Sequence, residues 1–215
     1  MGIAWFLMIL AFAPQAIYSQ IIVFTGSPSL IDPAVLTQAS LMAFAVGASF
    51  ILHELGHKFA AQRFHGRAAY RLDRQGLLYT IVSIFLGIYL LVPGAVFWES
   101  DLAQYDNVRG RVAASGPMVN LVLASISLGL IGLGLNAPEF SLEWILFSFG
   151  WISFYLNVYL GLFNLVPVWI LDGRKIFAWN ETVWLTMVML FASLALAGFI
   201  GVGMRFSFFI FTFPP

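Results

Sequence analysis

Five residues near the end of an apolar segment have the pattern of a metal-binding helix. The segment His53-Glu54-Leu55-Gly56-His57 contains the motif H-E-x-x-H. Side chains four residues apart lie on one face of an α-helix, so both imidazoles can reach the same ion. Imidazole nitrogens suit zinc, and a site with three protein ligands keeps one position for water. Glu54, beside a ligand, can take a proton from that water, which indicates hydrolytic chemistry.

The placement of this motif favours function over chance, although short motifs of this kind also occur in unrelated proteins. The segment Ala34–Leu52 contains no charged residue. An ionisable side chain at the centre of a bilayer costs at least ~2.5–3.5 kcal/mol. A helix of this length reaches ~28 Å, which puts His53 near one edge of the hydrocarbon layer. Groups that are costly in this position indicate a functional site.

The third metal ligand has three candidates. A thiolate is excluded because the chain has no cysteine. His65 is expected to be a solvated loop histidine, and Glu99 is expected in a surface loop. Asp172 follows an apolar segment that should end on the same side of the membrane as His53. Its carboxylate would complete a zinc site of two histidines and one carboxylate, although an Asp-Gly pair is also common as a turn at a helix end.

The composition indicates a membrane protein. Of the 215 residues, 61% are hydrophobic and 9% are charged, and the mean hydropathy is +0.92. Soluble domains carry roughly 25% charged residues. The 10 Lys and Arg residues equal the 10 Asp and Glu residues, whereas a nucleic-acid-binding protein needs a basic excess. A lipid bilayer is therefore an expected partner and nucleic acid is not.

Apolar runs that approach the ~20 residues needed to cross a bilayer recur along the chain. Membrane helices are predicted over Gly2–Phe24, Ala34–Leu52, Leu77–Phe97, Val112–Leu135, Trp144–Leu165 and Val183–Met204. The loops rich in Lys and Arg, 58–74 and 174–175, are expected in the cytoplasm. The sequence thus predicts an all-α polytopic membrane protein, a bundle of about six transmembrane helices, with the active site toward the cytoplasmic side.

The predicted span Leu77–Phe97 conflicts with this topology. The helices that carry His53 and Gly116 should both meet the cytoplasmic side at these residues, so an even number of crossings must separate them. A re-entrant or doubled-back segment, broken at Pro93-Gly94, resolves the conflict, with a short strand over Val92–Trp98 near the active site. Such backbone is tolerated in a membrane where protein or water covers it. The edge of the strand could pair with an extended substrate.

Three sequence blocks occur in the order found in a known family. They are H-E-L-G-H at 53–57, the G-P-x-x-N pattern within Ala114-Ser115-Gly116-Pro117-Met118-Val119-Asn120, and N-x-x-P-x-x-x-x-D-G at 164–173. Together they resemble the site-2 protease family of intramembrane zinc metalloproteases, over most of the chain from Ala34 to about Ala178. The chain departs from the family at Trp169, where a second proline is frequent, and this bears on the shape of the substrate groove.

The resemblance implies a set of site residues. The ligands of one Zn²⁺ ion would be His53, His57 and Asp172, with Glu54 as general base. Asn164 and Pro167 would lie beside the cleft and hold the substrate; a helix C-terminal cap is the alternative role of Asn164. The implied activity is regulated intramembrane proteolysis, the hydrolysis of peptide bonds in or near transmembrane helices of membrane-protein substrates.

The resemblance also implies a setting. Residues 1–215 are expected to form a single membrane-embedded metalloprotease domain in a prokaryotic cell membrane, without a separate soluble regulatory domain. Three alternatives use the same residues. A metal-transporting or metal-binding membrane protein would not need Glu54 as a ligand, and an inactive relative would only bind membrane proteins. Another type of membrane zinc protease would use a downstream glutamate such as Glu99.

Overall fold

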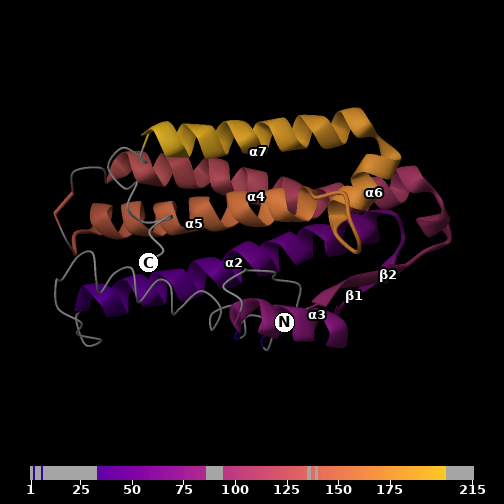
Figure 1. The fold of residues 1–215 in the computed structure, drawn as a ribbon, viewed down its shortest axis with the longest axis horizontal. Helices are drawn as coiled ribbons and strands as arrows, with labels where there is room; N and C mark the ends of the chain where they lie inside the picture. Colours follow the sequence, from indigo (N-terminus) through magenta and orange to yellow (C-terminus); the bar gives the residue numbers. More distant parts are fainter. Residues whose placement is uncertain are drawn as a thin grey trace.

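The computed structural model describes residues 33–85, 94–134, 137–138 and 140–201, together with Gly2 and Phe6. Within these parts the chain is mainly helical, and four long helices lie side by side along the longest axis (Figure 1). The elements are α2 (Pro33–Arg63), β1 (Arg67–Leu72), α3 (Arg74–Phe85), β2 (Gly94–Glu99), a 3-10 helix η1 (Asp101–Gln104), α4 (Asp106–Leu133), α5 (Leu142–Leu165), α6 (Asp172–Trp179) and α7 (Glu181–Gly201).

Four helices are long and apolar enough to cross a membrane. The apolar segments are Leu36–Arg63, Asp106–Leu133, Leu142–Leu165 and Glu181–Gly198. A helix suits this setting because it satisfies its own backbone hydrogen bonds where no water is present. Large apolar side chains such as Phe44, Leu133 and Leu196 are exposed on the outside of the bundle, as lipid-facing residues should be. The prediction of about six spans is confirmed for four; the predicted first span lies almost wholly outside the described residues.

The helix that carries H-E-x-x-H is longer than predicted. α2 continues past the predicted apolar span Ala34–Leu52 and past the motif to Arg63, because residues of high helix propensity follow the motif. The helix then closes with a left-handed turn, in which His65 has a φ of 57° and Gly66 N–H donates to Ala61 O at 2.9 Å. The histidines of the motif therefore lie inside the helix, where four-residue spacing brings them together.

The predicted span 77–97 doubles back instead of crossing the bundle. α3 ends at Phe85, residues 86–93 lie outside the described part, and β2 begins at Gly94. β2 pairs antiparallel with β1, and Leu72 lies opposite Gly94. Because Leu72 and Gly94 are paired neighbours, the segment between them leaves and returns to the same place in the structure. The doubled-back segment and a strand at residues 94–98 are confirmed, whereas β1, in a stretch interpreted as a polar loop, was not predicted.

The other long helices agree with their predicted spans except at their ends. α4 begins at Asp106, ahead of the predicted Val112, and continues through Pro117. α2 and α4 cross closely, because a Cβ atom at Gly56 would lie 2.9 Å from the carbonyl oxygen of Ser115. Small residues permit such crossings in membrane proteins. The crossing brings the start of α4 against the histidines of α2.

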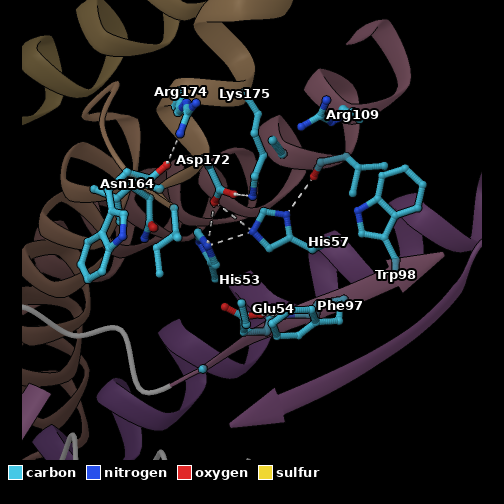
Figure 2. A pocket seen from close by; sticks show the side chains of 18 of the residues that line it. His53, Glu54, His57, Phe97, Trp98, Arg109, Asn164, Asp172, Arg174 and Lys175 are labelled. Atoms are coloured by element: carbon cyan, nitrogen blue, oxygen red, sulfur yellow. Dashed lines mark hydrogen bonds and ion pairs between the residues drawn. The ribbon is translucent and has the colours of Figure 1, made fainter. Parts of the chain in front are cut away.

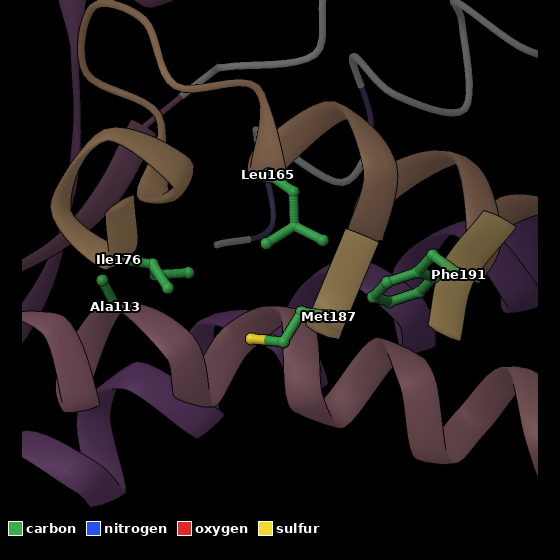
Figure 3. Packing of buried hydrophobic residues seen from close by; sticks show 5 residues of the cluster. All are labelled: Ala113, Leu165, Ile176, Met187 and Phe191. Atoms are coloured by element: carbon green, nitrogen blue, oxygen red, sulfur yellow. The ribbon is translucent and has the colours of Figure 1, made fainter. Parts of the chain in front are cut away.

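A buried apolar cluster fixes the short helix α6 across the end of the bundle. It contains Ala113 of α4, Leu165 of α5, Ile176 of α6, and Met187 and Phe191 of α7 (Figure 3). The first turn of α6 also abuts α5, because a side chain at position 173 would overlap the carbonyl of Leu165, so only glycine fits there. These contacts determine where the first residue of α6, Asp172, lies.

Candidate metal centre

Three buried side chains from α2 and α6 converge on one point. The Nε2 atoms of His53 and His57 are 3.1 Å apart. Oδ2 of Asp172 lies 3.4 Å from Nε2 of His53 and 3.0 Å from Nε2 of His57. Figure 2 shows the three side chains pointing toward one another. Within the described part of the chain, they form a group that could hold a metal ion.

The spacing of these atoms fits zinc. Imidazole nitrogen and carboxylate oxygen bind zinc at ~2.0–2.2 Å in a tetrahedral arrangement, which separates the ligand atoms of one ion by ~3.3–3.6 Å. The observed separations of 3.0–3.4 Å are close to this range. Two imidazoles and one carboxylate are also the donor set of hydrolytic zinc sites, in which the fourth position holds water. The donor set and its geometry therefore both fit one zinc ion.

The other ring nitrogen of each histidine is held by a hydrogen bond. Nδ1 of His57 donates to the carbonyl of Val112 at 2.8 Å, and Nδ1 of His53 donates to Oδ1 of Asn120. Such partners fix the tautomer and the ring orientation of a metal-binding histidine. With the protons on Nδ1, both Nε2 lone pairs face Asp172.

The Glu54 carboxylate lies on the opposite side of the imidazoles from Asp172, beside β2 (Figure 2). It is 5% exposed, and its Oε2 accepts a hydrogen bond from the backbone N–H of Val96 at 2.9 Å. Glu54 follows His53 by one residue, so its side chain leaves α2 in a different direction from the two imidazoles. A carboxylate thus lies next to the ligand group without belonging to it.

A cleft of about 770 Å³ opens over the ligand group. Residues 94–98 of β2 line one side of it, and the turn before α6 lines another. Cationic side chains of Arg109, Arg174 and Lys175 lie on the same side of the imidazoles as Asp172 (Figure 2). The cleft combines an extended backbone edge with a group of metal-ligating side chains.

Besides the two imidazoles, a lysine side chain lies close to the Asp172 carboxylate. Nζ of Lys175 lies 3.5 Å from Oδ1 of Asp172. Against the effect of burial, which raises the pKa of the Asp172 carboxyl group, the ammonium group of Lys175 favours the charged form and lowers this pKa. The charged carboxylate is the form that binds a metal ion.

The predicted substrate residues differ in their positions. Asn164 lines the cleft, and its Nδ2 donates to the carbonyl of Leu160 in its own helix at 3.0 Å. Pro167 is exposed and is not among the residues that line the cleft. A role in substrate binding stays a prediction for both.

The departure from the family pattern at Trp169 has a physical reason. Trp169 has a φ of 53°, and a proline ring fixes φ near −65°, so proline cannot adopt this backbone. The indole lines the cleft and meets the ring of Tyr79 edge-on, with 4.8 Å between centroids. An aromatic side chain therefore occupies this part of the cleft wall.

The alternative third ligands lie elsewhere. His65 is exposed in the turn after α2, and Glu99 is exposed at the end of β2, opposite Arg67. Neither belongs to the metal-ligating group found in the described residues. Two residues of this region received no predicted role: Asn120, which contacts His53, and Gly116. A polar side chain inside an apolar span is a signal that could have identified Asn120.

Gly116→Ala is expected to abolish stable zinc binding. A Cβ atom at this position would overlap Nε2 of both His57 and His53, so the rings would have to move from the positions in which they face Asp172. Gly129→Ala in the same helix is the matched control, because a Cβ atom there meets nothing within 4 Å. Zinc content per chain after dialysis measures the effect; equal zinc in both variants would contradict it.

Comparisons with known proteins agree with this donor set. Residues 41–142 match the sequence profile of peptidase family M50. A protein of Methanocaldococcus jannaschii that is named a zinc metalloprotease is 33% identical over 141 residues, which cover 65% of this chain and 70% of that protein. A protein of Mycolicibacterium smegmatis with a similar name is 32% identical over 136 residues, which cover 58% of this chain and 51% of that protein. No solved structure matches the chain.

Proposed function

The chain belongs to peptidase family M50, the site-2 protease family of zinc metalloproteases, and on this premise we propose that it hydrolyses peptide bonds in or near transmembrane segments of membrane proteins. One observation carries the proposal. The two imidazole nitrogens and one carboxylate oxygen converge within 3.4 Å in a bundle whose long helices are apolar enough to span a membrane. Such a centre suits hydrolysis at membrane depth.

Each residue of the centre has a proposed role. His53, His57 and Asp172 are the zinc ligands and Glu54 is the general base. Zinc, when bound, would polarise the scissile carbonyl and make a water molecule acidic at neutral pH. Glu54 removes the proton from that water and later donates a proton to the leaving amine. The position of its carboxylate next to the ligand group supports this role.

The substrate is proposed to bind as an extended chain along β2. A peptide bond in a helix is shielded, so a transmembrane substrate must unwind locally. The Val96 N–H donates to Glu54 rather than to β1, and every second N–H of a strand points to the same side. On this side β2 has no strand partner among the described residues. A substrate segment could pair with this edge, as in other cases of strand addition.

Asn164 and Pro167 are proposed to hold the substrate on the other side of the cleft. The place of Asn164 in the cleft wall supports this role, and its amide could steady the extended chain or the developing oxyanion. Its Nδ2 donates to the carbonyl of Leu160, one turn back in the same helix, and the alternative role of Asn164 is a cap of the last turn of α5.

We extend the proposal to the setting of the enzyme. Residues 1–215 would form one membrane-embedded metalloprotease domain in a prokaryotic cell membrane, with the centre toward the cytoplasm. The distribution of positive charge supports this side, because loops rich in Lys and Arg stay in the cytoplasm. The end of the bundle that holds the ligands also carries Arg63, Arg67, Arg71, Arg74, Arg174 and Lys175.

Removal of the metal is expected to stop cleavage of a membrane substrate. The purified chain would be reconstituted in lipid vesicles with a single-pass membrane protein, and fragments would be measured before and after treatment with a zinc chelator. Cleavage should disappear with the metal and return when zinc is added. The same substrate without its transmembrane segment is the control for the membrane requirement. Cleavage that resists complete removal of zinc would contradict the proposal, and zinc flux without cleavage would favour the transporter.

A further inference from the structure

A buried chain of hydrogen bonds joins the three helices around the ligand group. Asn120 of α4 accepts from His53 of α2 through Oδ1, and its Nδ2 donates to Oδ1 of Asn157 of α5 at 2.7 Å. Nδ2 of Asn157 donates to the backbone carbonyl of Ser153 at 2.8 Å and to Oγ of Ser49 at 2.9 Å. Both asparagines are 0% exposed.

This chain of hydrogen bonds has one favourable direction. A side-chain amide offers a donor at one end and an acceptor at the other, and a half-turn exchanges them. A backbone carbonyl can only accept, so the Ser153 carbonyl requires Asn157 to present Nδ2 to it and Oδ1 to Asn120. Asn120 must then present Nδ2 to Asn157 and Oδ1 to His53. The carbonyl of Ser49, 3.4 Å from Nδ2 of Asn120, favours the same orientation.

The direction of the chain decides which nitrogen of His53 carries its proton. Because Oδ1 of Asn120 accepts, Nδ1 of His53 must donate, and Nε2 keeps the lone pair that faces Asp172 and His57. A reversed amide at Asn120 would donate to Nδ1 instead. The proton of the neutral ring would then lie on Nε2, which could not bind a metal ion.

We propose that Asn120 and Asn157 are positioning residues that fix the metal-binding tautomer of His53. The Ser153 carbonyl sets the orientation of both side-chain amides. The inference rests on the zinc ligands of the proposed function. Asn157 does not line the cleft and acts through Asn120. Polar side chains that are fully buried among apolar helices are costly without a partner. Here each amide has its partners within the same series of hydrogen bonds.

The proposal can be tested with a double-mutant cycle. Asn157→Leu is expected to lower zinc affinity by ~10–100-fold, the usual effect of losing an outer partner of a metal ligand. In the Asn120→Asp background the same substitution should cost less than ~3-fold, because a carboxylate accepts from His53 with either oxygen and needs no orienting partner. Competition with a chelator on the purified chain measures both affinities. Equal losses in the two backgrounds would overturn the proposal, since they would mean that Asn157 acts only through packing.

Ser127→Ala is the matched control for loss of a buried polar group. Ser127 lies on α4 like Asn120, is 2% exposed, and donates to the carbonyl of Leu123 in its own helix at 2.7 Å. Its removal should leave zinc affinity within ~3-fold of the unmodified chain, because no ligand depends on it. A loss as large as that of Asn157→Leu would also contradict the proposal.

A second measurement uses the protein without any substitution. The chain has three histidines, so nitrogen NMR of the zinc-free protein, above the pH at which imidazoles titrate, can report each tautomer. His53 should carry its proton on Nδ1, and a proton on Nε2 would overturn the proposal. Neither measurement depends on proteolysis. A protein with the expected tautomer and affinities that cleaves no substrate would disprove the proposed function alone.

Discussion

Glu54→Gln is expected to lower the rate of peptide-bond cleavage by about 10²–10⁴-fold while one zinc ion stays bound. Glutamine has nearly the volume of glutamate, and its amide oxygen can still accept the hydrogen bond that Val96 N–H now donates at 2.9 Å. The amide cannot take a proton at neutral pH, so the water molecule would lack its base. The metal-ligating group found in the described residues does not include this side chain.

Two measurements are needed for Glu54→Gln: the rate of substrate cleavage in vesicles, and zinc content per chain. Glu99→Gln is the matched control, because it makes the same chemical change at the exposed end of β2. The control should cleave at the rate of the unmodified chain. Cleavage at an unchanged rate in Glu54→Gln would rule out Glu54 as the general base. Loss of zinc in that variant would instead assign it a part in metal binding.

Asp172→Ala is expected to remove zinc and, with it, all activity. The substitution deletes the only carboxylate in the ligand group of the described residues, and two imidazoles would be left to hold the ion. The loss of affinity should exceed the ~10–100-fold that follows removal of an outer partner. Lys175 would also lose its anionic neighbour, and its unpaired charge beside the imidazoles would further disfavour a cation.

Zinc content per chain after dialysis against a weak chelator measures the effect of Asp172→Ala. Asp172→Asn preserves the shape of the side chain and should also lose zinc, because the amide oxygen carries no charge. Asp106→Ala removes an exposed carboxylate that lines the same cleft without touching the ligands and should retain zinc. If zinc content is unchanged in Asp172→Ala, another residue supplies the third ligand.

The sequence predicted the parts of the molecule that depend on short-range patterns. Four-residue spacing of His53 and His57 follows from helical geometry alone, and the four spans in the described residues follow from apolar runs of sufficient length. The doubled-back segment was predicted because the helices of His53 and Gly116 had to meet the same side. Asp172 was named as a ligand from its place after an apolar span and from the family pattern; the structure brings it to the histidines.

The sequence did not predict features that depend on contacts between distant segments. β1 was missed because its pairing partner, β2, lies beyond α3 in the chain. The full length of α2 was not predicted, because charged residues after Leu52 indicated the end of the apolar run, whereas the helix continues through the motif and ends before the left-handed turn of His65. Asn157 received no role, since its function depends on Asn120 and Ser153, which only the folded bundle brings together or orients.

The hydrogen bond between Val96 and Glu54 has a consequence for the state of the site when no substrate is bound. The backbone N–H of Val96, with which a substrate peptide would pair in the proposed function, already donates to the Glu54 carboxylate. A peptide that paired with Val96 would displace Glu54 from this donor, and the carboxylate would then be free to turn. Substrate binding and release of the general base would then be one step. Without a peptide, the Glu54 carboxylate would stay restrained by its hydrogen bond to Val96.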